Sequence, residues 1–184
     1  MEHEDEVFDI VDESNTVVRQ EYRGVVHRTG LLHRAVYCWV YDTQGRLLLQ
    51  KRSPLKKIGP NQWDLSLAEH LQPGESYREA VVRGLKEELG ISLQDASNSG
   101  AVLVGPIAQT HKRELHEGEF HDVELVQSFR LEGFHDASSL KFDDGEVIDV
   151  QWIDPGSLQS LIQECPQNYT AWLQAEAAYL NWKP

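Results

Sequence analysis

The chain of 184 residues has few cysteines, no long hydrophobic run and little positive charge. Cys38 lies in an apolar run and Cys165 stands beside Pro166, so they provide neither metal-binding spacing nor a disulfide framework. No run approaches the roughly 18 apolar residues of a membrane span, and the acidic first residues lack the apolar segment of a secretory signal. We therefore expect a cytoplasmic protein that does not act at a membrane.

Basic residues are also scarce, because 17 Lys and Arg stand against 30 Asp and Glu, for a net charge of −13. This balance disfavours a broad surface for a nucleic acid polymer. It does not exclude small anionic ligands, since carboxylates that hold a divalent cation can present positive charge to a phosphate through that cation.

No internal repeat or linker divides the sequence, so a single domain over residues 1–184 is expected, with a flexible acidic N-terminus over about residues 1–6. Runs rich in β-branched and aromatic residues, bounded by turn residues, predict strands. These strands lie at residues 7–11, 16–22, 35–41, 46–52, 63–68, 101–110, 121–131 and 147–153. Two C-terminal helices should begin at Asp154-Pro155 and at Thr170, the second with a Trp and Tyr stripe typical of a core.

The strongest predicted helix covers residues 77–89. Ser76 and Glu79 have the spacing of a capping box, and Gly90 stands where a helix ends in the left-handed conformation. Glu87 and Glu88 near its end are expected to point at a common volume. Two such carboxylates repel each other unless a hard cation lies between them.

Residues 69–91, EHLQPGESYREAVVRGLKEELGI, resemble the Nudix signature, Gly-x5-Glu-x7-Arg-Glu-U-x-Glu-Glu-x-Gly-U, where U is a bulky aliphatic residue. Seven of the nine fixed positions match, at Glu75, Arg83, Leu85, Glu87, Glu88, Gly90 and Ile91. The resemblance implies an α/β fold in which an α/β/α sandwich surrounds a mixed β-sheet. It also implies that Mg²⁺ or Mn²⁺ is held against a diphosphate while water attacks phosphorus.

By the same resemblance, Glu87 and Glu88 are metal ligands with a catalytic role, whereas Glu75, Arg83 and Gly90 are structural. The chain departs from the signature twice, with Glu69 for the first Gly and Gly84 for the Glu after Arg83. Glycine in a helix interior costs about 1 kcal/mol relative to alanine, so propensity does not explain Gly84. Either Glu69 replaces the missing carboxylate as ligand or base, or hydrolytic activity has been lost.

A second group of candidate ligands lies outside this motif. His27 and His33 precede a predicted strand, His70 follows Glu69, and Asp122 and Glu124 share one face of another strand because strand side chains alternate. Over residues 5–155 this pattern resembles isopentenyl-diphosphate isomerase, a Nudix-fold enzyme that binds a divalent metal through three His and two carboxylates. The resemblance implies that these five residues bind metal; the alternative is that they only form local hydrogen bonds.

The isomerase also needs a cysteine just before its Gly-His pair, where this chain has Ala68 before Glu69. Alanine cannot transfer a proton, and Cys38 lies on a different predicted strand. A hydrolase of the isomerase-like branch is therefore favoured over an isomerase.

Other charged residues complete the candidate site. The densest basic group includes Lys51 and Arg52 and extends to Lys56 and Lys57, and it would either bind substrate phosphates or form a solvated loop. Glu146 is either an extra catalytic acid or part of an acidic turn. Residues 111–116 are expected to be a polar loop that either covers the pocket or has no specific role.

The sequence thus predicts a metal-dependent hydrolase of a small-molecule diphosphate, such as a nucleoside, isoprenoid or cofactor diphosphate. The alternatives are an isomerase-like enzyme and an inactive diphosphate-binding module. Neither the substrate nor the oligomeric state follows from the residues.

Overall fold

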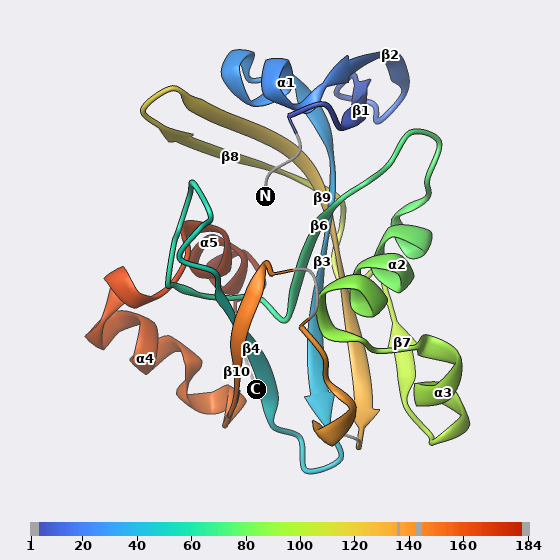
Figure 1. Cartoon of the computed structure of the whole chain (residues 1–184), viewed down its shortest axis with the longest axis vertical. Helices are drawn as coiled ribbons and strands as arrows, with labels where there is room; N and C mark the ends of the chain where they lie inside the picture. The colour runs from blue at the N-terminus through green and yellow to red at the C-terminus, as the bar shows by residue number, and fades with distance from the viewer. Residues whose placement is uncertain (1–3, 136, 143–144, 182–184) are drawn as a thin grey trace.

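A computed structural model describes residues 4–135, 137–142 and 145–181. Two long strands form the centre of the molecule (Figure 1), β3 (Leu32–Asp42) and β9 (Phe120–Phe134). They pair in parallel from Leu32 opposite Val123 to Asp42 opposite Phe134. Parallel strands need a crossover connection between them. Residues about 90 positions apart in the sequence therefore lie side by side along β3 and β9.

The remaining strands add to this pair and make a mixed sheet. On one side β4 (Leu47–Arg52) leads to β10 (Val147–Ile153), and on the other β1 (Val7–Val11) leads to β2 (Val17–Tyr22). The sheet also contains β5 (Trp63–Asp64), which pairs with β4, and β6 (Leu67–His70), which pairs with β3. Finally, β7 (Val102–Val104) and β8 (His111–Glu117) pair antiparallel with β9.

Helices cover both faces of the sheet, as the alternation along β3 requires. Val36, Cys38 and Val40 pack toward α2 (Tyr77–Leu89) and α3 (Leu93–Asn98). Tyr37 and Trp39 pack in a second core with α4 (Leu158–Glu164) and α5 (Ala171–Tyr179). The expected α/β/α sandwich around a mixed sheet is therefore confirmed.

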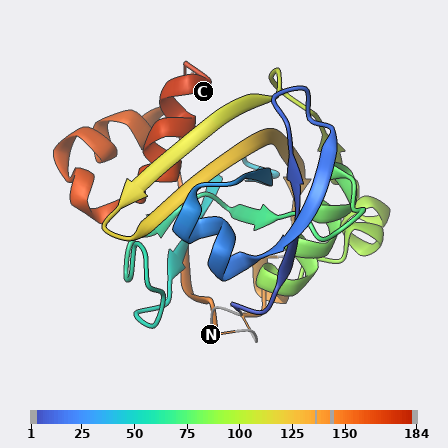
Figure 2. The same ribbon diagram turned by 90° about the horizontal axis from the view of Figure 1, so that it is seen from above.

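One end of the sheet is covered by the N-terminal part of the chain. Helix α1 (Arg23–Thr29) lies there beside the β1–β2 hairpin, and the β8–β9 hairpin passes next to it (Figure 2). Residues 1–3 of the N-terminus expected to be flexible lie outside the described residues. In the described part of this segment, Glu4 pairs with Lys57 at 2.6 Å and Glu6 with Arg23 at 2.8 Å, and the flexibility of the segment stays a prediction.

Helix α2 begins and ends where the sequence predicts. The Ser76 side chain accepts from the Glu79 backbone N–H, the Glu79 carboxylate accepts from the Ser76 N–H, and Gly90 has φ 69°. Val81, Leu85 and Leu89 are buried against the sheet. The opposite face of α2 is exposed. Whether a carboxylate of this helix points to the sheet or to solvent therefore depends on its position around the helix axis.

Several predicted elements differ from the structure. Helices α1 and α3 were not predicted, the strand expected over residues 63–68 is divided into β5 and β6, and the strand expected over 101–110 covers only β7. The polar loop expected over residues 111–116 is strand β8, which pairs with β9 around a turn at Gly118 (φ 60°). The sequence of β8 lacks the apolar alternation that predicts a strand, because none of its side chains is buried and most are exposed.

The C-terminal helices follow their predicted capping signals. Asp154 caps the short 3₁₀ turn η2 (Pro155–Ser157) that precedes α4, and the Thr170 side chain caps α5. Two further 3₁₀ turns are η1 (Ala137–Ser139) and η3 (Pro166–Asn168). The last aromatic residue of the predicted stripe, at position 182, lies outside the described residues. Over the described ranges, no helix combines the length and the apolar character needed to cross a lipid bilayer.

Candidate active site

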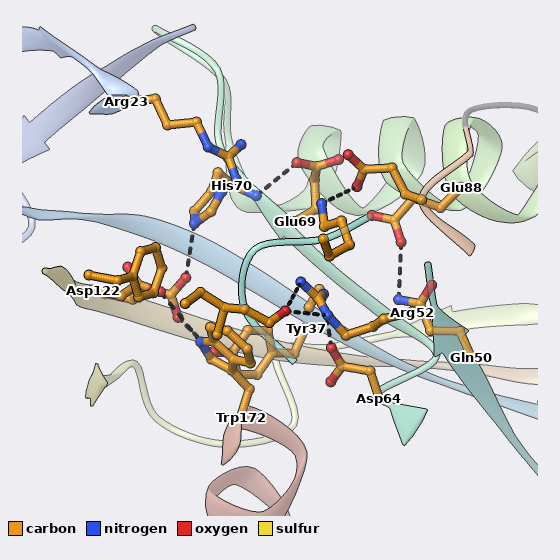
Figure 3. A pocket seen from close by; sticks show the side chains of 16 residues that line it. Arg23, Tyr37, Gln50, Arg52, Asp64, Glu69, His70, Glu88, Asp122 and Trp172 are labelled. Atoms are coloured by element: carbon orange, nitrogen blue, oxygen red, sulfur yellow. Dashed lines mark hydrogen bonds and ion pairs between the residues drawn. The ribbon is translucent and has the colours of Figure 1, made fainter. Parts of the chain in front are cut away.

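A cavity opens between the sheet, the loop after β4 and the start of α5. Its empty space, counted together with the open mouth, is about 760 Å³. Figure 3 shows that cations, carboxylates and aromatic rings from distant segments point into it. The residues that argue for a function form three groups: a histidine and carboxylate group that reaches the cavity through His70, Asp122 and Glu124, an acidic edge beside α2, and a set of cations.

The histidine and carboxylate group, called the cavity cluster below, unites all five metal ligands expected outside the signature motif. They come from four elements, with His27 on α1, His33 on β3, His70 on β6, and Asp122 and Glu124 on β9. One ligand atom from each of the first four lies within 4.8 Å of the others. His70 Nε2 lies 3.2 Å from Glu124 Oε1. Pairing of His33 opposite Glu124 in the β3–β9 register makes this convergence possible.

Burial sets the charge state of the cavity cluster. It lowers the pKa values of His27, His33 and His70, so these imidazoles are neutral, which is the form that binds metals. Burial, together with repulsion between the two carboxylates, raises the pKa of Asp122, and burial raises that of Glu124. The cluster therefore contains no positive charge of its own to offset its acids.

Unsatisfied polar atoms indicate that the cavity cluster fits a cation. His27 Nε2, His33 Nε2 and Asp122 Oδ1 are buried and form no hydrogen bond. Asp122 Oδ1 lies 3.6 Å from His27 Nε2 and 3.3 Å from His33 Nε2. His33 Nδ1 lies 2.9 Å from the Leu31 carbonyl; donation to it leaves the Nε2 lone pair directed into the cluster. Nitrogen and oxygen donors of this kind suit Mn²⁺, Zn²⁺ or a related divalent ion.

An aromatic residue that the sequence analysis missed supports these imidazoles. The ring of Phe8, 1% exposed, lies 5.2 Å from the ring of His33, 4.7 Å from that of His70 and 5.9 Å from that of His27. Because Phe8 fills the space behind three rings, it restricts their rotation. No sequence signal marks this residue, since Phe8 reads as one apolar position of an ordinary strand.

The acidic edge beside α2 brings Glu69 and Glu88 together at the cavity (Figure 3). Glu88 is 6% exposed and accepts a 3.1 Å hydrogen bond from Gln50 Nε2. Burial, with the charge of Glu69 next, raises the pKa of Glu88. Burial also raises the pKa of Glu69 to about 7, although the Arg83 guanidinium opposes the shift. Glu69 is therefore in exchange between its two protonation states near neutral pH.

The expectation that Glu87 and Glu88 point at a common volume is wrong in this structure. The Glu87 side chain is 55% exposed, pairs with Arg83 at 3.1 Å and lies on the outer side of α2. Adjacent residues of a helix are about 100° apart around its axis, so only one of them can face the sheet here. The metal and catalytic roles expected for Glu87 remain untested predictions without a contact to the cavity.

Gly84 is explained by crowding around its Cα. A Cβ at this position would lie 2.9 Å from Leu67 Cδ1 and 3.3 Å from Glu69 Cβ. The Glu69 side chain thus stands against the position from which a signature Glu would project. It extends from strand β6. This arrangement is compatible with a carboxylate exchanged between positions 84 and 69.

The structural part of the motif has the expected contacts. Arg83 donates from Nε and Nη2 to the two carboxylate oxygens of Glu75, both at 2.9 Å, and from Nη2 to the His70 carbonyl at 2.9 Å. Arg83 Nη1 also lies 3.1 Å from Glu69 Oε2. These contacts connect the start of α2 to β6, and so they fix the segment that carries both Glu69 and His70.

Only one of the two predicted substrate-binding cations reaches the cavity. Arg52 lines it, whereas Lys51 turns away and places its Nζ over the Trp63 ring at 5.3 Å. Adjacent residues of a strand face opposite sides, which the sequence analysis did not apply to this pair. Two further cations line the cavity: Arg23, which was missed with helix α1, and Lys56, which pairs with Glu146 at 2.9 Å.

Several other residues of the wall were missed. Tyr37, Gln50 and Asp64 lie on strands that read as core, and Trp172 belongs to the stripe that was interpreted as core. Tyr37 donates to Glu124 Oε2 at 2.6 Å, and Trp172 Nε1 lies 3.4 Å from Asp122 Oδ2. His111 and Arg113, placed in the predicted covering loop, instead contact the buried Glu176 at 2.8 Å and 2.6 Å.

Comparison with known proteins identifies a family for this chain. The sequence model of the NUDIX domain matches residues 31–173. The chain is 33% identical over 172 residues to isopentenyl-diphosphate Delta-isomerase 1 of Aromatoleum aromaticum, covering 94% of this chain and 90% of that protein. It is 35% identical over 154 residues to an uncharacterized Nudix hydrolase of Clostridium acetobutylicum, covering 82% and 71%.

Among solved structures, a Deinococcus radiodurans protein superimposes with a TM-score of 0.66 at 23% identity, covering 90% of this chain and 93% of the other. A MutT protein from Methanosarcina mazei superimposes with a TM-score of 0.56 at 23% identity, covering 83% and 96%. These likenesses concern the fold.

Proposed function

The chain belongs to the Nudix family, and from this premise we propose that it is a metal-dependent hydrolase of small molecules that contain a diphosphate. The observation that carries the proposal is the composition of one cavity wall. Arg23, Arg52 and Lys56 line the same cavity as the acids Glu69 and Glu88 and three members of the cavity cluster, His70, Asp122 and Glu124. Cations that can bind phosphate oxygens therefore line the same cavity as groups that can hold a divalent ion.

The residues divide the work of hydrolysis. His27, His33, His70, Asp122 and Glu124 would hold one divalent ion, and Glu88 with Glu69 would hold Mg²⁺ or Mn²⁺ at the α2 edge. Such ions neutralise phosphate charge and polarise a phosphoryl oxygen when bound. Glu69 is proposed as the base: it accepts a proton from water, the water oxygen bonds to phosphorus, and the bridging P–O bond breaks to release the second phosphate.

For an isomerase, one set of observations is favourable and another is unfavourable. A relative that covers almost the whole chain is named an isomerase, and the cavity cluster contains the ligands expected from that resemblance. However, Ala68 lines the cavity where the isomerase would have its cysteine. Cys38 faces the α2 core, and neither it nor Cys165 lines the cavity. We therefore prefer hydrolysis, and expect no deuterium uptake from solvent into isopentenyl diphosphate.

A screen of the purified protein against nucleoside, isoprenoid and cofactor diphosphates tests the proposal. Phosphate release should require added Mg²⁺ or Mn²⁺ and should stop after chelation. Metal-dependent binding, measured by calorimetry, without release of phosphate from any compound would instead support a binding module that has lost its chemistry.

Substitution of single carboxylates tests the assigned roles. Glu69→Gln should reduce turnover by about 100-fold, the scale of general-base catalysis, and Glu88→Gln by a similar factor. Glu87→Gln should change turnover less than about threefold, because its exposed side chain has no contact to the cavity. Turnover of Glu69→Gln equal to wild type would contradict its role as base, and equal losses in Glu87→Gln and Glu88→Gln would restore the paired-acid interpretation.

A further inference from the structure

The guanidinium of Arg52 is held by groups from three separate segments of the chain. Its Nε and Nη2 donate to the Ile58 carbonyl at 3.2 Å and 3.1 Å, and its Nη1 donates to Asp64 Oδ2 at 3.2 Å. The ring of Trp172 covers it, with Cζ 5.4 Å from the ring centroid. Figure 3 shows Arg52 and Asp64 side by side at the cavity. A long and normally mobile side chain is thereby confined to one position.

Asp64 receives only donors. Besides Arg52, its Oδ1 accepts from the Leu65 backbone N–H at 2.8 Å and from the Thr170 hydroxyl at 2.6 Å. Asp64 and Thr170 are both 0% exposed. An ionised carboxylate has acceptor sites on both oxygens, whereas an amide would turn an NH₂ group toward one of these donors. The site at position 64 therefore requires a carboxylate for its geometry.

Thr170 connects this arrangement to the C-terminal helix. Its hydroxyl caps α5 by accepting from the Leu173 backbone N–H at 3.2 Å, and its own N–H donates to the Trp63 carbonyl at 2.9 Å. Two residues later, Trp172 covers Arg52. The start of α5 thus restrains the guanidinium of Arg52 by two routes. Thr170 holds Asp64, which pairs with Arg52, and the ring of Trp172 covers Arg52.

We propose that Asp64 and Thr170 are positioning residues that fix Arg52 for binding the diphosphate of the substrate. The inference rests on the proposed function and assigns part of its specificity. A guanidinium has five N–H donors, and three are used in the contacts above. One N–H remains on each terminal nitrogen, which is the arrangement that binds two phosphate oxygens at once. Fixing the side chain beforehand removes the ordering cost at the moment of binding.

Neutralising Asp64 changes the affinity for phosphate in opposite directions, depending on whether its charge or its positioning of Arg52 matters more. A carboxylate beside Arg52 offsets part of its positive charge, so by charge alone its neutralisation would strengthen phosphate binding. If position matters more, the same neutralisation weakens binding because Arg52 loses its fixed orientation. We expect the second result.

The test measures binding of methylenediphosphonate, a diphosphate analogue whose P–C–P bridge is not hydrolysed, by calorimetry with Mn²⁺ present. Asp64→Asn should raise Kd about tenfold, equivalent to about 1.4 kcal/mol. Thr170→Val should raise it about threefold, while Thr170→Ser, which keeps the hydroxyl, should bind like the wild type. In an Arg52→Gln background, Asp64→Asn should cause no further loss, since the two residues act through one guanidinium.

Ser66→Ala is the matched control for loss of a buried polar group. Ser66 is 0% exposed, donates to the Leu48 carbonyl at 2.6 Å and accepts from the Val40 N–H at 2.8 Å, but it has no contact with Arg52. This variant should lower the melting temperature and leave Kd unchanged. If Asp64→Asn fails to fold, the Thr170→Val and Thr170→Ser pair still decides the question.

The outcomes separate this inference from the proposed function. The positioning role alone would be overturned if the protein hydrolyses a diphosphate but Asp64→Asn binds the analogue as tightly as the wild type. It would also be overturned if Asp64→Asn lost as much affinity in the Arg52→Gln background as it does in the wild type. Binding that depends on Asp64 and Thr170, without hydrolysis of any diphosphate, would keep the positioning role and overturn the hydrolase. A wild-type protein that does not bind the analogue would overturn the positioning role, because Arg52 would then have no diphosphate to bind.

Discussion

Two buried groups of histidine and carboxylate lie on the same face of β9, and they solve the same electrostatic problem in opposite ways. The cavity cluster uses Asp122 and Glu124 of this strand, and a second group, the sealed cluster, joins Ser128 to Glu176, His111 and Arg113. Both groups contain a carboxylate that is less than 4% exposed. They differ in what offsets the charge of that carboxylate.

In the sealed cluster the protein itself supplies the donors. Glu176 accepts from Ser128 at 2.5 Å, contacts His111 Nε2 at 2.8 Å and pairs with Arg113 at 2.6 Å. Burial alone would raise the pKa of Glu176, but the hydrogen bonds and the nearby cations outweigh burial and hold its pKa below the ordinary value. The charged form is therefore favoured without any ligand.

In the cavity cluster the set of donors is incomplete: Tyr37 donates to Glu124 and Trp172 to Asp122 Oδ2, but the second oxygen of Asp122 has no donor. The pKa of Asp122 is raised by burial and by Glu124, and its Oδ1 forms no hydrogen bond. Ser128, six residues after Asp122 on β9, takes part in a full set of partners for the buried Glu176 of α5, whereas the set of partners around Asp122 is incomplete. The difference teaches that unsatisfied buried atoms at a cavity, and not the mere presence of His and Asp, distinguish a site for an external cation from a structural ion pair.

The largest expected effect comes from exchanging one histidine in each cluster. His33→Ala should weaken Mn²⁺ or Zn²⁺ binding at least about 100-fold, since loss of a ligand exceeds the 10- to 100-fold cost of losing an outer partner. His111→Ala should leave metal binding unchanged, although it lowers stability. Metal content after dialysis, measured by mass spectrometry, checks both. Equal metal contents in the two variants would remove the distinction between the clusters.

A smaller effect is expected on stability. Metal at 100 times its Kd should stabilise the wild type by about 2.7 kcal/mol, because it binds the folded state. Asp122→Asn should lose most of this gain while its metal-free form melts no lower than the wild type, since the substitution removes a repulsive charge. Thermal melts with and without metal measure both quantities. A metal-free Asp122→Asn protein that melts well below wild type would show that the carboxylate stabilises the fold as Glu176 does.

The smallest effect concerns acid stability in the sealed cluster. Because the folded pKa of Glu176 lies below its ordinary value of 4.5, its stabilising contribution is complete above that pH and is lost as the pH falls through the folded value. Glu176→Gln should cost about 1–3 kcal/mol at pH 7 by leaving donors unsatisfied. Urea titrations at several pH values should show this cost shrinking below pH 4.5. A cost that stays constant with pH would contradict the assigned charge.

Local signals in the sequence were sufficient for the elements and motif that depend on neighbouring residues. The capping box at Ser76, the glycine at position 90 and the Glu75 and Arg83 spacing predicted helix α2 and its internal contacts, because all of these operate within a few residues. The alternation of strands likewise placed Asp122 and Glu124 on one face. The fold class and the candidate ligands of the cavity cluster followed from such patterns and from the family resemblance.

Tertiary packing decided the rest. Which of Glu87 and Glu88 faces the cavity depends on how α2 rotates against Leu67 and Glu69, and no local pattern contains that angle. Arg23, Phe8 and Trp172 entered the site through the parallel pairing of β3 with β9 and the docking of α1 and α5. These are contacts over long sequence separations, in which each residue appears locally as an ordinary strand, turn or core position. The sequence by itself determined the chemistry available to the protein, whereas only the folded sheet determined which of those groups share one cavity.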